Sequence, residues 1–187
     1  MSSLREVINK LGTERHIHLK ECEIKEMIIY IDRITNYLGE RAIHLMMHCN
    51  RKELRLSDIK NACRIELKED LIQSHLKYSN YIVTRYFEIK KGYSIELLNE
   101  IFNYEKLCPS KILLEMDIYL PFNYFRDKLK LLENYQVKYE STIFLIAMIQ
   151  STIITLINSL SGYRKNKPQT KIEEVLNNYK CHSDIIW

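Results

Sequence analysis

The sequence predicts an all-α protein, and three observations carry this prediction. Glycine and proline are scarce, at four and three in 187 residues, which leaves few sites for the tight turns of β-hairpins. Apolar residues recur every three or four positions along residues 21–64, as they do on one face of a helix. No charged residue occurs between Thr142 and Gly162. With 46% hydrophobic residues, the chain can bury a large core.

The first helix that we expect covers residues 3–11, where Ser3 is a suitable N-cap and Gly12 ends the helix. Residues 16–19 alternate between polar and apolar side chains, which predicts an extended loop. A long amphipathic helix then runs from about residue 21 to residue 49.

A short strand and a short helix follow the long helix. The strand is predicted at residues 54–56, and Ser57 is the expected N-cap of a helix that ends near residue 64. Another amphipathic helix is expected over residues 68–87, followed by a linker at residues 89–93.

The remainder of the chain also reads as helical. Ser94 caps a predicted helix to about residue 107, and Pro109 opens another around residues 112–116. We expect both to be helical padding on the surface. A helix begins near Pro121, and a long one runs from about residue 141 to residue 163.

The uncharged stretch between Thr142 and Gly162 raises the question of a membrane, since about 18 apolar residues can span a bilayer. Polar residues interrupt this stretch, among them Gln150, Thr155 and Asn158. A helix buried against a partner explains the composition more simply, so we expect no membrane span.

Arg51 precedes Asp58 by seven residues, with Leu54 between them. This spacing resembles the arginine and aspartate that brace the second loop in many core and archaeal histones. The segment from Asp58 to Tyr86 also resembles the last fold helix and the extra C-terminal helix of histone two-B.

The second half carries a further resemblance. Leu120-Pro121-Phe122, Asn134-Tyr135 and Val137 resemble the first helix, first loop and central helix of histone two-A, with one residue inserted before Asn134. Thr170-Lys171-Ile172 falls where histone two-A has Thr-Arg-Ile in its second loop. The order, two-B and then two-A, resembles the fused histone doublets of some large DNA viruses of protists.

The resemblance implies two histone folds fused in one chain, closed on each other as an intramolecular handshake pseudo-dimer. The expected domains are a two-B-like fold with its C-terminal helix at residues 1–88, a helical connector at 89–119, and a two-A-like fold with a short tail at 120–187. In such a pseudo-dimer the first loop of each half lies beside the second loop of the other half. The tail ending in Ile185-Ile186-Trp187 is too short to copy the docking segment of histone two-A.

A histone core binds DNA at its phosphates, through loop N–H groups, helix N-termini and basic side chains, without reading base edges. The cations expected at the loops and on the first helix of the second half are the DNA-binding candidates. They are His16, His18, Lys20, Arg51, Lys52, Arg55, Arg126, Lys128, Lys130, Lys138, Lys165, Lys167 and Lys171. Each of them also has a simpler interpretation as a solvated surface cation. For Arg51, the internal brace to Asp58 is a second role.

Charge limits this interpretation. The net charge is only +4, far below that of a tailed histone, and neither end carries a lysine-rich tail. Residues 1–93 hold 17 Lys and Arg against 13 Asp and Glu, whereas residues 94–187 hold 11 of each. Any DNA contact must therefore be local.

The resemblance also implies a protein partner. Leu45, Met46 and His48, with the helix at 57–64, are expected to form an exposed face that engages a complementary histone pair of the two-three and two-four kind. The acidic patch of histone two-A is expected to be missing, because Gln150, Thr155 and Asn158 stand at its positions and Tyr78 replaces an acid of histone two-B, although Asp70 keeps one.

No catalytic constellation is evident, so we expect no enzyme activity, no cofactor and no small-molecule substrate. His44 and His48 have a spacing that can chelate zinc, but Leu45 stands where a metalloprotease needs its general base, and we expect no metal. Five scattered cysteines without a signal peptide predict reduced thiols inside a cell or viral compartment rather than secretion. The resemblance to histone doublets implies a location in a nucleus, a viral factory or virion chromatin.

Two functions remain open. The first is a histone doublet that binds and bends double-stranded DNA without sequence specificity, in a nucleosome-like particle of viral chromatin. The alternative is a histone-fold subunit of a transcription or replication complex that acts mainly through protein contacts.

Overall fold

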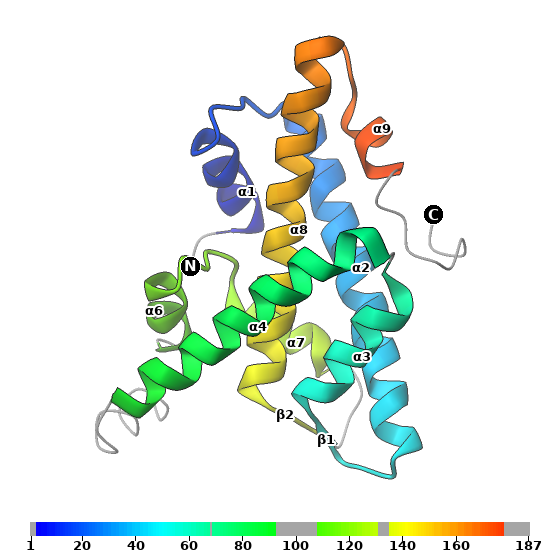
Figure 1. The fold of residues 1–187 in the computed structure, drawn as a ribbon, viewed down its shortest axis with the longest axis vertical. Coiled ribbons are helices and arrows are strands. Elements are labelled where there is room, and N and C mark those ends of the chain that lie inside the picture. The colour runs from blue at the N-terminus through cyan, green and yellow to red at the C-terminus, as the bar shows by residue number, and fades with distance from the viewer. Residues whose placement is uncertain (1–2, 68, 93–107, 131–134, 178–187) are drawn as a thin grey trace.

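The computed structural model describes residues 3–67, 69–92, 108–130 and 135–177, and within them the protein is mostly α-helical (Figure 1). The all-α prediction is confirmed for these ranges. Their only β structure is one pair of two-residue strands.

The N-terminal elements are α1 (Leu4–Thr13), α2 (Glu21–His48), β1 (Glu53–Leu54) and α3 (Leu56–Glu66). Ser3 caps α1, as expected, in a reciprocal capping box with Glu6. Gly12 does not end α1 but lies buried inside it, where an added Cβ would meet the carbonyl oxygen of Ile17 at 3.1 Å.

Two other expected boundaries are also wrong. Helix α3 begins after Arg55, not Ser57, because the carboxylate of Asp58 accepts the Arg55 N–H and fixes the first turn there. The strand correspondingly lies at 53–54 rather than 54–56.

The C-terminal elements are α4 (Glu69–Gly92), α6 (Cys108–Glu115), α7 (Phe122–Leu129), β2 (Gln136–Val137), α8 (Tyr139–Asn166) and α9 (Ile172–Leu176). Helix α4 continues through most of the expected linker at 89–93. The predicted helix at 94–107, Asn134 and the tail at 180–187 lie outside the described residues. Helix α6 buries Ile112 and Leu113 and exposes Leu114, so one face packs on the core and another meets solvent.

Helix α8 is the centre of the core. It runs alongside α2 in the opposite direction, and α4 crosses it with the most extensive helix contact of the structure (Figure 1). Residues 141–150 of α8 are buried without interruption, so neighbours cover it on all sides.

The burial of α8 bears on the membrane question. Within the described residues, α8 alone is long and apolar enough to cross a bilayer, with a mean hydropathy of 1.9 over 18 residues. However, 72% of that window is buried inside the structure, and a core helix passes the same test.

Strands β1 and β2 pair in parallel, with Glu53 opposite Gln136 and Leu54 opposite Val137. Ser141, at the start of α8, donates its hydroxyl to the Leu54 carbonyl at 3.1 Å. These bonds join the loop after α2 to the loop before α8, which are distant in the sequence.

Candidate nucleic-acid interface

The predicted DNA-binding residues gather at opposite ends of the antiparallel helices α2 and α8 (Figure 1). At one end, residues 49–55 lie beside residues 135–138, and we call this the first loop pair. At the other end, residues 14–20 lie near residues 164–171, and we call this the second loop pair.

Main-chain hydrogen bonds hold the first loop pair together. Gln136 N donates to Lys52 O at 2.9 Å, and Lys138 N donates to Leu54 O at 3.3 Å. The relative position of the two loops is therefore set by the backbone.

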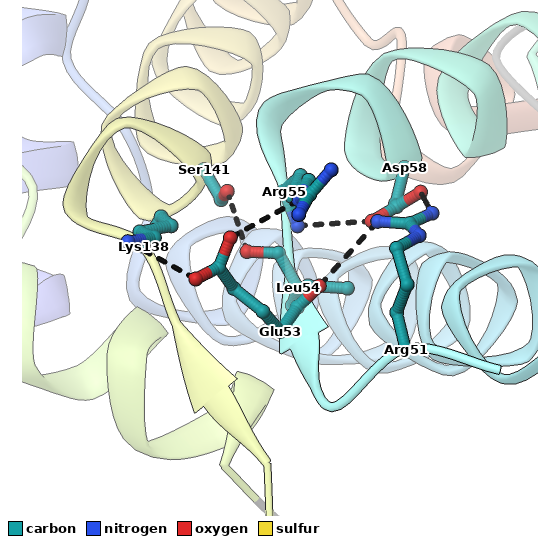
Figure 2. A network of polar contacts seen from close by, with 7 residues as sticks. All are labelled: Arg51, Glu53, Leu54, Arg55, Asp58, Lys138 and Ser141. Carbon is teal, nitrogen blue, oxygen red and sulfur yellow. Dashed lines mark hydrogen bonds and ion pairs between the residues drawn. The ribbon is translucent and has the colours of Figure 1, made fainter. Parts of the chain in front are cut away.

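Arg51 and Asp58 form a two-point ion pair beside this backbone pairing (Figure 2). The two guanidinium nitrogens of Arg51 donate to the two carboxylate oxygens at 2.9 and 2.6 Å. Asp58 is buried, and the hydrogen bonds to it raise the pKa of Arg51. Arg51 is thus engaged inside the loop.

The residue before Arg51 also shapes this loop. Asn50 takes the left-handed conformation, with φ 49°, which Asn tolerates better than most residues.

Glu53 connects the remaining cations of the first loop pair (Figure 2). Its Oε1 accepts from Arg55 Nε at 3.1 Å, and its Oε2 lies 3.1 Å from Lys138 Nζ. The hydrogen bonds from Lys138 and Arg55 lower the pKa of Glu53. Lys52 is exposed, with no ion pair among the described residues.

The second loop pair is held by a side chain. Arg164, in the last turn of α8, donates to His18 O at 3.4 Å and forms an ion pair with Glu23 near the start of α2. Glu23 also accepts the Lys20 N–H at 2.7 Å. No strand pairing joins these loops in the part of the chain described.

A hollow of about 400 Å³ opens between these two loops. Its lining combines cations and acids, which are Lys20, Arg164, Lys171, Glu23, Glu26 and Glu173. Burial, together with Glu173 and Glu23, raises the pKa of Glu26. Lys20 and Lys171, from distant parts of the sequence, therefore border one depression.

The other candidates of the second loop pair are exposed. His16 takes the left-handed conformation, with φ 55°, and His18 follows it on the surface. Lys167 lies 3.3 Å from Glu174, whereas Lys165 has no ion pair among the described residues.

The three cations associated with α7 differ in their availability. Arg126 lies over the ring of Tyr139, 4.8 Å from its centroid, and Lys128 is 3.0 Å from Asp32 of α2. Lys130 is exposed and pairs with no acid of the described residues. It is the most available phosphate ligand of the three.

Two residues that organise the loop pairs were not predicted from the sequence. Arg164 is the first charged residue after the uncharged stretch, which is a signal that could have marked it. Glu53 gave no such signal, because Lys138, the second of its two cationic partners, meets it only through the strand pairing.

The expected partner face is partly wrong. Met46 is 2% exposed and belongs to the core, whereas Met47 is 57% exposed. Leu45 is half-buried, and His48 is exposed. Ile65 on α3 is exposed as well, whereas Met46 cannot contribute to an exposed face.

The three residues of α8 that stand at the acidic-patch positions of histone two-A differ in exposure. Gln150 is buried, where its amide donates to Asp117 O at 2.7 Å and accepts from Tyr119 N at 2.8 Å. Thr155 is half-buried and Asn158 is exposed. Gln150 therefore supports a turn and presents nothing to a partner.

His44 and His48 are both exposed. In the described ranges, no group of three or more His, Cys, Asp or Glu side chains is arranged to hold a metal ion.

Comparison with models of known protein families gives no match, and comparison with curated protein sequences gives none either.

Proposed function

We propose that this chain is a histone doublet that binds and bends double-stranded DNA without sequence specificity, as part of a nucleosome-like particle. The observation that supports it most is the parallel pairing of residues 53–54 with 136–137, because it brings cations from both halves of the chain to one edge. The Arg51–Asp58 ion pair, which the resemblance to histones pointed out, adds support.

The proposed contact is with phosphates. At the first loop pair, Lys52, Arg55 and Lys138 would face the backbone of the duplex, and at the second loop pair Lys20, Lys165 and Lys171 would do so. Phosphate contacts carry no sequence information, so binding is independent of sequence.

The separation of the two loop pairs would let one duplex contact both of them. They lie at opposite ends of 28-residue helices, which at 1.5 Å per residue span about 40 Å, more than one turn of B-DNA. A duplex that contacts both ends must follow the protein surface for that distance. A single doublet offers only two such sites, so we propose that a complementary histone pair completes the particle. Its proposed location is viral or nuclear chromatin.

The test is to measure the affinity of the full chain for two duplexes of unrelated sequence as the salt concentration rises. A DNA packager binds both alike, and log K falls linearly with log salt with a slope of about −0.9 per phosphate contact. Absence of binding at 50 mM salt, or preference for one sequence, contradicts the proposal.

One observation favours the alternative, a histone-fold subunit of a transcription or replication complex. Acids of the chain already neutralise several candidate cations, since Glu53 holds Arg55 and Lys138, and Asp32 holds Lys128. Such a subunit would bind DNA weakly alone and would require its protein partner. Adding a complementary histone pair, followed by nuclease digestion, separates the two functions, because only a packager protects a DNA fragment of defined length.

A further inference from the structure

Glu53 occupies an unusual position for a protein that binds phosphates. It lies on β1, between two candidate DNA-binding cations that come from different loops (Figure 2). Each of its carboxylate oxygens has one cationic partner, Arg55 on one side and Lys138 on the other. The acid thus sits at the centre of the first loop pair.

The geometry of this contact resembles that of a bound phosphate. A DNA phosphate offers two non-bridging oxygens, which can accept from two cations in the way that the Glu53 carboxylate does. The N···O distances of 3.1 Å are ordinary for such contacts. Glu53 therefore uses the same donors that a phosphate needs.

Exposure separates Glu53 from the other acid of this loop pair. The Asp58 side chain is 3% exposed and bound by Arg51, whereas the Glu53 side chain is 30% exposed and its partners are more open still. A surface ion pair of this kind is worth little free energy and can open. Only Glu53 can exchange its cations with a ligand from solvent.

We propose that Glu53 is an internal competitor of DNA phosphate, which holds Arg55 and Lys138 until a phosphate displaces it. The inference rests on the proposed DNA binding and says how the protein itself limits that binding. The first loop pair then binds DNA less tightly than its cations alone would allow. The carboxylate returns to the cations when DNA leaves.

The competing interpretation is a structural strap, in which Glu53 only ties the two loops together. The two interpretations differ in the direction of one effect. Loss of a strap loosens the loops and weakens or leaves unchanged the binding of DNA. Loss of a competitor strengthens it.

The experiment compares Glu53→Gln with Glu88→Gln by fluorescence anisotropy on one duplex between 50 and 200 mM salt. Glu88 is an exposed acid on α4 without an ion pair among the described residues, so both variants change the net charge equally. A second variant, Glu53→Ser, removes the bridging hydrogen bonds together with the charge. Urea unfolding checks that each variant remains folded.

The expected result is that both Glu53 variants bind more tightly than the wild type and Glu88→Gln does not match them. The gain in K at 50 mM salt should be about two- to fivefold, the change that corresponds to no longer having to break weak surface ion pairs before binding. The slope of log K against log salt should change by less than one contact of about 0.9, because Arg55 and Lys138 contact phosphate in both complexes once Glu53 is displaced.

The gain must depend on the two cations. In an Arg55→Gln/Lys138→Gln background, Glu53→Gln should no longer increase affinity. A gain that persists there, or one equal to that of Glu88→Gln, shows a general charge effect and overturns the inference. Unchanged or weaker binding by Glu53→Gln also overturns it, while absence of binding by every protein, wild type included, rejects the proposed function instead.

Discussion

The two loop pairs solve the same problem of joining distant segments in different ways. In the first loop pair the backbone makes the junction, through the pairing of β1 with β2, and acids hold Arg51, Arg55 and Lys138. In the second loop pair one side chain, Arg164, makes the junction. A junction made by the backbone does not depend on cations for its geometry.

The comparison shows which loop pair carries the cations that have no ion pair among the described residues. Lys20, Lys165 and Lys171 of the second loop pair have no ion pair among the described residues, although Glu26 lies close to Lys171. More of the cations of the first loop pair are held in ion pairs, and those of the second are the more available to a phosphate. The following predictions test this contrast.

The largest expected effect is on stability at the first loop pair. Arg51→Met leaves the buried Asp58 carboxylate without its cation and should lower the free energy of unfolding by about 3 kcal/mol. Urea unfolding measures this, with Lys52→Met, its exposed neighbour, as the control within about 0.5 kcal/mol of the wild type. Equal effects of the two substitutions would show that the Arg51–Asp58 ion pair is not needed.

The matching change at the second loop pair should cost less. Arg164→Met removes one charged hydrogen bond to a buried carboxylate, where Arg51→Met removes two, so the expected loss is about 1.5 kcal/mol; Glu23 also borders a hollow that water can enter. The same urea experiment measures it. A loss larger than that of Arg51→Met would reverse the order of the two junctions.

The third prediction concerns DNA. Lys165→Gln and Lys171→Gln should each reduce the salt slope of binding by about 0.9, because both cations are available to phosphates. Lys138→Gln should lower the affinity by less than either of them, since binding by Lys138 must first break its ion pair with Glu53. Anisotropy titrations at several salt concentrations provide the slopes, and a larger effect of Lys138→Gln would place the main contact at the other loop pair.

The smallest effect is a dependence on pH. The pKa of Glu26 is raised in the folded protein above 4.5, so its ionised form opposes folding. This penalty is absent below about pH 4.5 and complete above the folded pKa. Glu26→Gln should therefore be slightly more stable than the wild type at pH 7 and equal to it near pH 4, as read from urea midpoints. A difference that grows as the pH falls would have the wrong sign.

The sequence sufficed for features that depend on near neighbours. The long helix α2 follows from apolar spacing, and the Arg51–Asp58 pair is visible because its members are seven residues apart. The boundary errors come from local competition, as at α3, where Asp58 and not Ser57 supplies the capping acceptor. Adjacent residues on a helix point about 100° apart. An error of one position therefore exchanges the buried Met46 for the exposed Met47.

Other features depend on contacts between distant residues. Glu53 and Arg164 form their ion pairs with the other half of the chain only after the loops of the two halves come together. The spacing of apolar residues along the sequence does not predict which loops will be neighbours. The resemblance put Gln150 at a position of the acidic patch, but its amide satisfies a buried turn. Polar residues of this kind are assigned correctly only when their partners are known.

The central claim is that both loop pairs contact one duplex. The most direct measurement is photo-crosslinking from a genetically encoded crosslinking residue placed at Lys52 or at Lys165, with a third placement at Glu88 as the control. The account predicts crosslinks to DNA from Lys52 and Lys165, at sites separated by more than one helical turn on the same duplex, and none from Glu88. Crosslinks from Glu88 alone, or from neither loop pair while the protein binds DNA, would contradict it.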